Sequence, residues 1–403
     1  MKWVDADLNA HPMTRRGFLA RSGALVAGAL AGVGVASGAT AGRTGLFTLA
    51  QRNGRWWLVT PEGEAFFSIG LNHIDPSPLR FTENGDLWPR KYGNSMERWL
   101  KEAVAPDLRA WGFNSVGWTQ EVVTRGPTNC RHSRAFTFEE YQWLGLPYCH
   151  QLPFAEFHQW EAETRHPDFA SAEFADWCDY VAREHCARMA GDPKLIGYFY
   201  VDCPTWVHTA KFAAWKGPLF DPEKLKTDAG RKALSELAGR YYRVTHDAIR
   251  RYDKNHLILG DRYEANAALP EEVVRAALPW VDVLSFQHFG PPEKVQADLR
   301  RWHELTGKPV LLADAARHVR QPNGALRHNG AGYAETLQRL RELSGCVGFH
   351  LCGAYLRNRT RHCGLRDEQE RLEDTETIAI ITKANREAAQ WMNSVGKLKG
   401  QEQ

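Results

Sequence analysis

Two aspartates close predicted buried strands, where their carboxyl groups would suit the hydrolysis of a glycosidic bond. Asp202 ends the aromatic run in GYFYVDCPTW, and Asp314 lies near the end of GKPVLLADAA. Two carboxyl groups facing each other across a cleft are the minimum for this reaction, because one protonates the leaving oxygen while the other attacks the sugar or activates water. We therefore predict Asp202 as the proton donor and Asp314 as the nucleophile or water-activating base. Asp261 and Glu264 are carboxyl groups in reserve.

Histidines and a cysteine near other strand ends leave two rival chemistries open. A metal site would use His73, His150, His288 and His350 together with Asp202 or Asp314, which are suitable donors for zinc or another divalent ion. No His-x-His or His-Glu-x-x-His spacing anchors these histidines, so the sequence predicts no metal and no cofactor. The other rival makes Cys203 a nucleophile with His150 or His288 as its base, although a small buried thiol is the simpler interpretation.

Polar and aromatic residues recur where predicted strands end, more densely than stability alone requires. Each buried polar group demands a partner, so such a ring of polar residues indicates a binding site. We expect Trp118 and Trp206 to act as flat platforms for a sugar ring. The predicted substrate-binding residues are Asn72, His73, Trp118, His150, Trp206, Asp261, Arg262, Glu264, Gln287, His288 and His350.

Alternating strand and helix patterns must position these residues. Apolar, β-branched or aromatic runs at 66–73, 113–119, 146–154, 195–202, 256–264, 281–289, 309–316 and 346–355 predict eight strands. Apolar residues at three-and-four spacing predict helices over 96–112, 173–192, 234–253, 295–307, 333–345 and 375–393.

This count is typical of a (β/α)8 TIM barrel, in which active sites lie at the carboxyl ends of the strands. A doubly wound open sheet is the alternative, but no glycine-rich phosphate turn follows the first strand. A turn signal at Asn53 and Gly54 predicts a short N-terminal β-hairpin before the barrel.

Composition narrows the class of partner. The 403 residues are 43% hydrophobic and 25% charged, as expected of a soluble enzyme. The formal net charge is +3 with no long basic run, so we expect no nucleic-acid partner. The 15 tryptophans suit sugar faces as well as protein cores, which points to a carbohydrate substrate. The oligomeric state is not evident.

The N-terminal segment has the layout of a twin-arginine export signal. Arg15 and Arg16 precede a weakly hydrophobic run of alanine, glycine and valine that ends in a small-residue cleavage site at Ala39-Thr40-Ala41. An uncleaved membrane anchor is the alternative, but the run is short and rich in glycine. We therefore predict a signal peptide over 1–41, a catalytic barrel over 42–403, a periplasmic or secreted location, and no stable membrane insertion after cleavage.

Several motifs resemble those of the β-agarase-type glycoside hydrolases, a family of retaining (β/α)8 enzymes. GYFYVDCPTW resembles the fourth-strand motif, which ends in an Asn-Glu pair shortly before a tryptophan, and GKPVLLADAA resembles the seventh-strand motif. HLILGDRYEAN, GCVGFHLCGAY and AFFSIGLNHID resemble the fifth, eighth and entry strands. The resemblance spans roughly Phe47 to Arg371. It implies a glycoside hydrolase that acts on galactans or related polysaccharides.

The family's catalytic residues are altered in this chain. The resemblance places the acid/base glutamate on Cys203, the preceding asparagine on Asp202 and the nucleophilic glutamate on Asp314. A thiol, with an ordinary pKa of about 8.5, is a far weaker acid than a carboxyl group. One interpretation moves the acid to Asp202, and the shorter Asp314 widens the gap between carboxylates and favours an inverting mechanism.

The other interpretation is a non-catalytic glycan-binding barrel, or altered chemistry such as a lyase or a metal-dependent reaction. Several arginines on the loops after the fifth, seventh and eighth strands would suit an acidic or sulfated glycan. They are Arg262, Arg317, Arg320, Arg357, Arg359 and Arg361.

Overall fold

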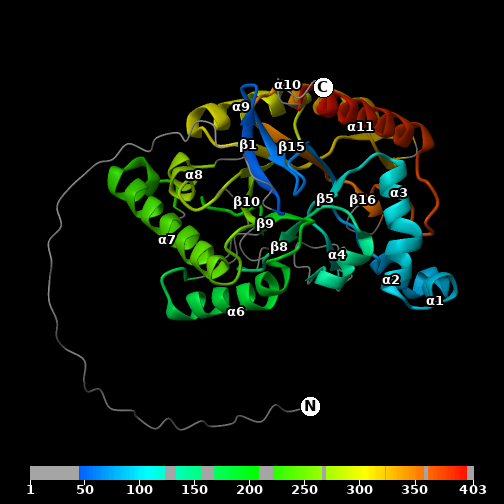
Figure 1. Ribbon diagram of the computed structural model, residues 1–403, viewed down its shortest axis with the longest axis horizontal. Helices are drawn as coiled ribbons and strands as arrows, with labels where there is room; N and C mark the ends of the chain where they lie inside the picture. The colour runs from blue at the N-terminus through cyan, green and yellow to red at the C-terminus, as the bar shows by residue number, and fades with distance from the viewer. Residues whose placement is uncertain are drawn as a thin grey trace, which may run out of the picture. The chain divides into compact units, whose positions relative to one another are not determined.

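Eight parallel strands close into a barrel in the computed structural model of this protein (Figure 1). In order around the barrel they are β4 (Ser68–Leu71), β5 (Ser115–Val116), β8 (Tyr148–Gln151), β9 (Leu195–Asp202), β10 (Leu257–Glu264), β11 (Leu284–Gln287), β12 (Val310–Ala315) and β15 (Cys346–Leu351). The last strand pairs with the first. Each lies within one of the eight apolar runs of the sequence, so the predicted (β/α)8 barrel is confirmed.

The structure describes residues 45–122, 133–155, 168–207, 221–265, 269–322, 324–357 and 362–396. The predicted signal peptide, with Arg15 and Arg16, lies outside these residues. So do Arg359 and Arg361.

Helices cover the outside of the barrel and connect its strands (Figure 1). The principal ones are α6 (Ala172–Met189), α7 (Asp228–Tyr252), α8 (Glu271–Ala277), α9 (Pro292–Thr306), α10 (Gly330–Glu342) and α11 (Thr375–Val395). Between β4 and β5 lie α1 (Leu87–Tyr92), α2 (Met96–Trp99), the π-helical turn η3 (Leu100–Val104) and α3 (Ala105–Ala110), and α4 (Phe138–Leu144) precedes β8.

Short polar side chains begin most of these helices. Thr137 and Glu140 form a reciprocal capping box at α4, and Ser171, Asn329 and Asp374 accept backbone N–H bonds at the starts of α6, α10 and α11. These caps satisfy N–H groups that the first helical turn leaves without partners. They fix where each connection leaves the barrel.

A small antiparallel sheet precedes the barrel and packs against its interior. It contains β1 (Thr48–Arg52), β2 (Arg55–Val59) and β3 (Ala65–Phe66). Asn53 and Gly54, which join β1 to β2, both have positive φ, 53° and 72°, as the tightest hairpin turns require. The predicted N-terminal hairpin is therefore present, with one additional strand.

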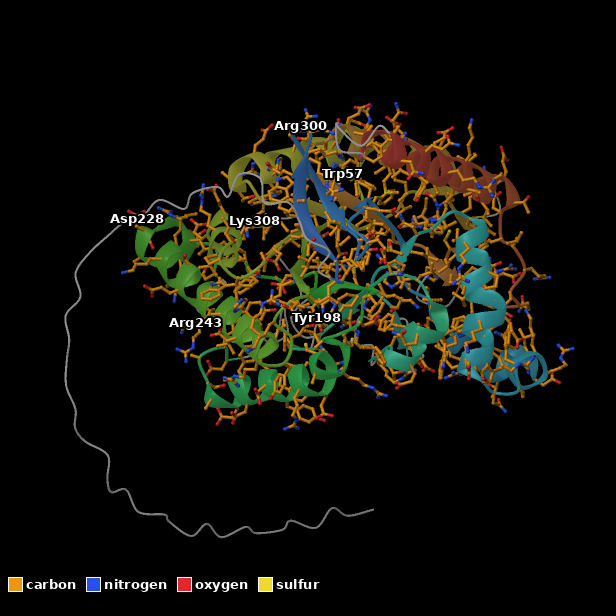
Figure 2. All side chains as sticks on the ribbon, in the orientation of Figure 1. Trp57, Tyr198, Asp228, Arg243, Arg300 and Lys308 are labelled. Carbon is orange, nitrogen blue, oxygen red and sulfur yellow. The ribbon has the colours of Figure 1, made fainter. Side chains whose placement is uncertain are left out.

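The barrel interior is a packed core. Phe47, Leu58 and Phe66 from the N-terminal segment share one buried cluster with barrel side chains that include Ile196 and Leu257 at the starts of their strands. The small sheet therefore closes the end of the barrel where the strands begin. In Figure 2, Asp228, Arg243 and Arg300 lie at the margin of the ribbon, whereas Tyr198 of β9 lies within the molecule, where its hydroxyl donates to Asp253 after helix α7.

Short β-pairs extend three of the connections that leave the carboxyl ends of the strands. β6 (Gln120–Val122) pairs with β7 (Ser133–Ala135), β13 (His318–Arg320) with β14 (Leu326–His328), and β16 (Ala354–Leu356) with β17 (Gly364–Arg366). No sequence pattern predicted these three pairs. Among the described residues, no helix combines the length and the apolar character needed to cross a membrane.

Gly197 provides a test of how tightly β9, the strand that ends in Asp202, packs on β10. A methyl group on Gly197 would lie 2.4 Å from the carbonyl oxygen of Leu257, whereas one on exposed Gly191 would meet nothing within 4 Å. Because a backbone oxygen cannot move aside as a side chain can, we expect Gly197→Ala to lower the free energy of unfolding by about 1–3 kcal/mol.

Urea unfolding of Gly197→Ala and the matched control Gly191→Ala measures the effect. The control should unfold like the wild type. Equal unfolding free energies for the two variants would contradict the close packing of β9 on β10.

Candidate active site

A buried arginine joins the two predicted catalytic aspartates. One terminal nitrogen of Arg262, Nη2, lies 3.0 Å from Asp314 Oδ2, and the other, Nη1, lies 3.4 Å from Asp202 Oδ1. The side chains of Arg262, Asp314 and Asp202 are 0%, 3% and 14% exposed, so the three charges interact with little screening by solvent. Burial alone would lower the pKa of Arg262, but the charges of Asp202 and Asp314 outweigh it and raise this pKa.

The strand order explains how the three residues meet. β9 and β10 are neighbours, and Asp202 pairs directly with Arg262 in their register. Asp314 comes from β12, two strands further around the barrel. The guanidinium of Arg262 therefore reaches across the carboxyl end of the barrel and contacts carboxylates from both sides.

Asn72 fixes the second carboxylate from the opposite direction. Its Nδ2 donates to Asp314 Oδ1 at 2.6 Å and to the carbonyl oxygen of Ala313 at 2.8 Å. Its Oδ1 accepts from the backbone N–H of Trp118 at 2.8 Å. One amide thus links the ends of β4, β5 and β12. The orientation of Asp314 is set by a hydrogen bond on Oδ1 and by the ion pair with Arg262 on Oδ2.

Two residues beside the aspartates have a backbone conformation that side chains disfavour. His73, which follows Asn72, has φ 57°, and Cys203, which follows Asp202, has φ 44°. Such left-handed residues are uncommon outside glycine and gather at functional sites. His73 Nε2 lies 3.8 Å from Asp314 Oδ2 and 3.6 Å from Cys352 Sγ.

Gln287 completes the ring around Asp202. Its side-chain nitrogen donates to Asp202 Oδ1 and contacts Cys203 Sγ at 2.9 Å. The same nitrogen lies 3.3 Å from the carbonyl oxygen of Arg262. Asn72, His73 and Gln287, which the sequence analysis assigned to the substrate site, are therefore in the same cluster as the two aspartates.

Glu264 is a third carboxyl group close to Asp202. It ends β10, two residues after Arg262, and therefore shares the inward face of the strand. Burial, and secondarily the nearby charge of Asp202, raise the pKa of Glu264. A carboxyl group that keeps its proton to higher pH is suited to donate it, which the sequence alone did not indicate.

Neither predicted tryptophan offers an open face for a sugar. Trp118 is 1% exposed, and its ring lies under the guanidinium of Arg262, 4.6 Å from the ring centroid. Trp206 is 2% exposed and packs among Phe169 and Tyr241 against helix α7. Trp118 thus supports the cluster from below, and the structure does not bring Trp206 to it.

His150 and Asp261 point away from the barrel axis into the helix layer. His150 Nε2 lies 2.9 Å from His185 Nδ1 of α6. Asp261 accepts from the hydroxyls of Tyr241 and Tyr242 of α7 at 2.9 and 2.6 Å, and burial raises its pKa to about 6. Their strands present alternate side chains to opposite faces, so the structure does not bring either residue together with the aspartates.

His288 and His350 have their side-chain partners outside the two aspartates. His288 Nε2 lies 2.9 Å from Asp298 Oδ2 of α9. His350 is fully buried in the interior, where its Nε2 lies 2.8 Å from the Ser68 hydroxyl, and burial lowers its pKa to about 3. The side-chain partners of both histidines are therefore Asp298 and Ser68 rather than either aspartate.

The cluster contains a possible metal-ligand group that the sequence spacing did not reveal. His73, Asp314 and Cys352 each offer one donor atom, and these atoms lie within 4.8 Å of one another. However, the Asp314 oxygen nearest to His73 is also the one that Arg262 Nη2 contacts at 3.0 Å. The fixed positive charge of the guanidinium disfavours a cation there.

The arrangement can therefore support acid–base chemistry. It holds two carboxylates from the fourth and seventh barrel strands against a shared cation, and it places a third carboxyl group with a raised pKa beside one of them. The sequence did not indicate that Arg262 bridges the two aspartates, or that Cys352 contacts His73 in this cluster. Strict strand alternation would have grouped Arg262 with Glu264 and separated both from Asp261.

Comparisons with known proteins support the fold. No family model and no curated protein matches the sequence. Among solved structures, the chain is similar to the agarase AgWH50C, with 18% identity and a TM-score of 0.63 over 87% of this chain and 64% of the agarase. It is also similar to an exo-beta-agarase, with 17% identity and a TM-score of 0.65 over 90% of this chain and 67% of the other.

A beta-glucuronidase from an uncultured Clostridium species is more distant, with 14% identity and a TM-score of 0.52 over 85% of this chain and 53% of the enzyme. The shared feature is the fold. The chain spans just under two thirds of the length of AgWH50C.

Proposed function

We propose that this protein is a glycoside hydrolase that acts on a polysaccharide or oligosaccharide. The observation that carries the proposal is the contact of Asp202 and Asp314, from opposed strands, with the two ends of one guanidinium at the mouth of the barrel. The similarity to agarases and a beta-glucuronidase, which share this barrel, supports the same class of substrate.

The proposed reaction uses Asp314 as the general base. It removes a proton from water as the water oxygen bonds to the anomeric carbon, and the glycosidic C–O bond breaks with its electron pair going to the leaving oxygen. A carboxyl group on the other side protonates that oxygen. The hydrogen bond from Asn72 and the charge of Arg262 favour the ionised form of Asp314 that a base needs.

Asp202 and Glu264 together supply the proton in this proposal. The charge of Arg262 and the hydrogen bond from Gln287 both favour an ionised Asp202. That negative charge adds to the effect of burial in raising the pKa of Glu264. In this proposal Glu264 carries the proton that is donated. The negative charge of Asp202 helps Glu264 to stay protonated.

We expect inversion at the anomeric carbon. Asp314 is one methylene shorter than a glutamate, which enlarges the gap between the reacting carboxyl groups. Inverting enzymes separate theirs by about 6.5–9.5 Å so that water fits between, compared with about 5–5.5 Å in retaining enzymes.

A galactan-like, acidic or sulfated glycan is the proposed substrate. Arg317 and Arg320 are exposed on the connection after β12 and are suitably placed to meet sulfate or uronate groups. Arg262 and Arg357, also considered for this role, are instead paired with internal carboxylates. The proposed location, periplasmic or secreted, rests on the twin-arginine segment within 1–41.

A non-catalytic glycan-binding barrel is the second candidate, favoured by Cys203. Its sulfur contacts Gln287 beside Asp202, at the position where the resemblance places the acid/base glutamate. A barrel that has lost this acid and kept its binding residues would bind a glycan without cleaving it. The two candidates predict different effects of removing the carboxylates.

Replacing the carboxylates one at a time tests hydrolysis. We expect Asp314→Asn to lower kcat by about 10²- to 10⁴-fold, because the amide cannot accept the proton from water. Turnover should be measured on a panel of neutral, sulfated and uronic polysaccharides, with NMR of the first-formed anomer. Asp228→Asn, at an exposed position on α7, is the matched control and should keep wild-type turnover.

Binding measured by calorimetry separates the two candidates. A hydrolase variant keeps its ligand and loses turnover, whereas a binding protein shows no turnover in the wild type and only a change in affinity in Asp314→Asn. The second result would refute the hydrolase proposal. Retention of configuration would refute the inverting mechanism alone.

The proton donor can be identified by measuring how activity depends on pH and on the leaving group of the substrate. Because the donor must be protonated, kcat/KM should fall as pH rises through the pKa of Glu264, which lies above the ordinary value of about 4.3. Glu264→Gln should remove this alkaline limb and most of the activity. It should lose far less activity on an aryl glycoside, whose good leaving group needs no proton.

Asp202→Asn is the comparison for this experiment. If Asp202 rather than Glu264 donates the proton, the Asp202→Asn variant will recover activity on the aryl glycoside, and the Glu264→Gln variant will not. That outcome would overturn the assignment of the donor without affecting the role of Asp314.

A further inference from the structure

Two histidines face each other across a short hairpin outside the proposed active site. His318 of β13 and His328 of β14 are direct partners in the antiparallel register, and their ring centroids lie 5.1 Å apart. Directly opposed residues on such a pair share one face. The hairpin lies on the connection that follows β12, the strand that carries Asp314.

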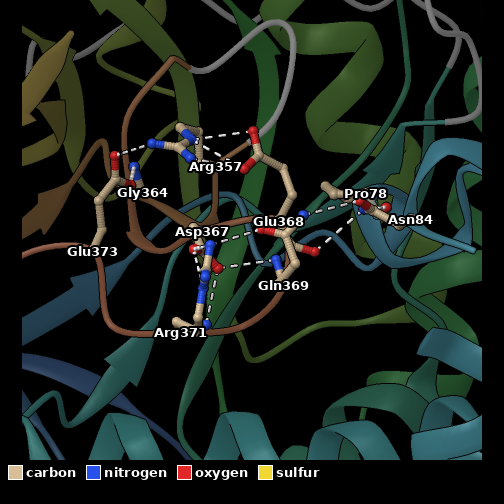
Figure 3. Close-up of polar contacts among 9 residues, drawn as sticks. All are labelled: Pro78, Asn84, Arg357, Gly364, Asp367, Glu368, Gln369, Arg371 and Glu373. Carbon is tan, nitrogen blue, oxygen red and sulfur yellow. Dashed lines mark hydrogen bonds and ion pairs between the residues drawn. The ribbon is translucent and has the colours of Figure 1, made fainter. Parts of the chain in front are cut away.

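A cysteine from a different connection completes the group. Cys363 lies just before β17, in the connection that follows β15, and is buried. Figure 3 shows the polar network that holds this segment: Glu373 accepts from the backbone N–H of Gly364 at 2.8 Å and from Arg357 Nη1 at 2.8 Å. Arg357 also pairs with Glu368 at 2.9 Å, so the position of Cys363 is braced from both sides.

The three donor atoms lie close enough together to reach one metal ion after small rotations of their side chains. One nitrogen from each histidine and the sulfur of Cys363 lie within 4.8 Å of one another. Tetrahedral zinc, with bonds of about 2.0–2.3 Å, requires donors roughly 3.3–3.8 Å apart, which small side-chain rotations can supply. His318 is exposed and provides a path for an ion to enter.

The buried ring of His328 is a second observation, separate from the donor distances, that points to a ligand at this position. It is 4% exposed, and neither of its ring nitrogens has a hydrogen-bond partner among the described residues. A buried polar group without a partner is destabilising and rare in proteins. A bound cation would satisfy it. We propose that His318, His328 and Cys363 bind a divalent transition-metal ion, with zinc the best match to this donor set.

The surroundings are consistent with a neutral-imidazole and thiolate site. Arg357 and Arg327, the nearby cations, are paired with Glu373 and Asp374, so the charges next to the site are largely balanced. In contrast, the guanidinium of Arg262 directly contacts Asp314, one of the three donors of the His73, Asp314 and Cys352 group.

The ion would have a structural consequence for the catalytic face of the barrel. It would tie the hairpin after β12 to the segment after β15, two connections that leave the same end of neighbouring strands. The proposal does not depend on hydrolysis, because its site shares no residue with the proposed active site.

Cobalt titration of the full chain, stripped of metal with a chelator, tests the site without reference to activity. We expect one equivalent of Co²⁺ to bind with a thiolate-to-cobalt absorption band, and zinc to displace it. Cys363→Ser should abolish the band. His318→Ala, at an exposed position where folding is insensitive to the change, should weaken binding by more than the roughly 10- to 100-fold that loss of an outer-shell partner causes.

Cys352→Ser is the matched control, since it removes the thiol of the other candidate group, and its cobalt band should match the wild type. Zinc should also raise the Tm of the wild type by several degrees and leave that of Cys363→Ser unchanged. No saturable cobalt binding in the wild type, or a band lost in Cys352→Ser and kept in Cys363→Ser, would overturn the proposal.

Discussion

The structure of the site depends on one buried guanidinium. Arg262 is fully enclosed in the barrel, and a charge removed from water in this way is stable only when opposite charges and hydrogen bonds compensate it. Asp202 and Asp314 provide the charges, and the ring of Trp118 provides a face beneath the guanidinium. Removing either carboxylate would leave part of the charge uncompensated, so the three groups hold one another in place.

The neighbouring residues give the three carboxyl groups different properties. Asp314 has hydrogen-bonding or ionic partners on both oxygens, whereas Glu264 lies where burial and the charge of Asp202 favour its neutral form. Separating the proton affinities of nearby carboxyl groups in this way is how acid and base roles are assigned in one site. Cys203, the residue after Asp202, has a left-handed backbone conformation.

The sequence predicted the barrel better than the site. Long apolar runs revealed all eight strands, because fully buried parallel strands are apolar on both faces. For the same reason, these runs hid which side of each strand faces inward, and so His150 and Asp261 were predicted at the mouth although they face the helices. The group of His318, His328 and Cys363 had no signal, since its members come from two connections with no regular spacing.

A double-mutant cycle on Arg262→Gln and Asp314→Asn tests the central interaction most directly. Urea unfolding gives the free energies of the wild type, both single variants and the double variant. If the guanidinium and the carboxylate compensate each other, the double variant should be less destabilised than the sum of the single variants by about 1–3 kcal/mol. Effects that add to within about 0.5 kcal/mol would contradict the account.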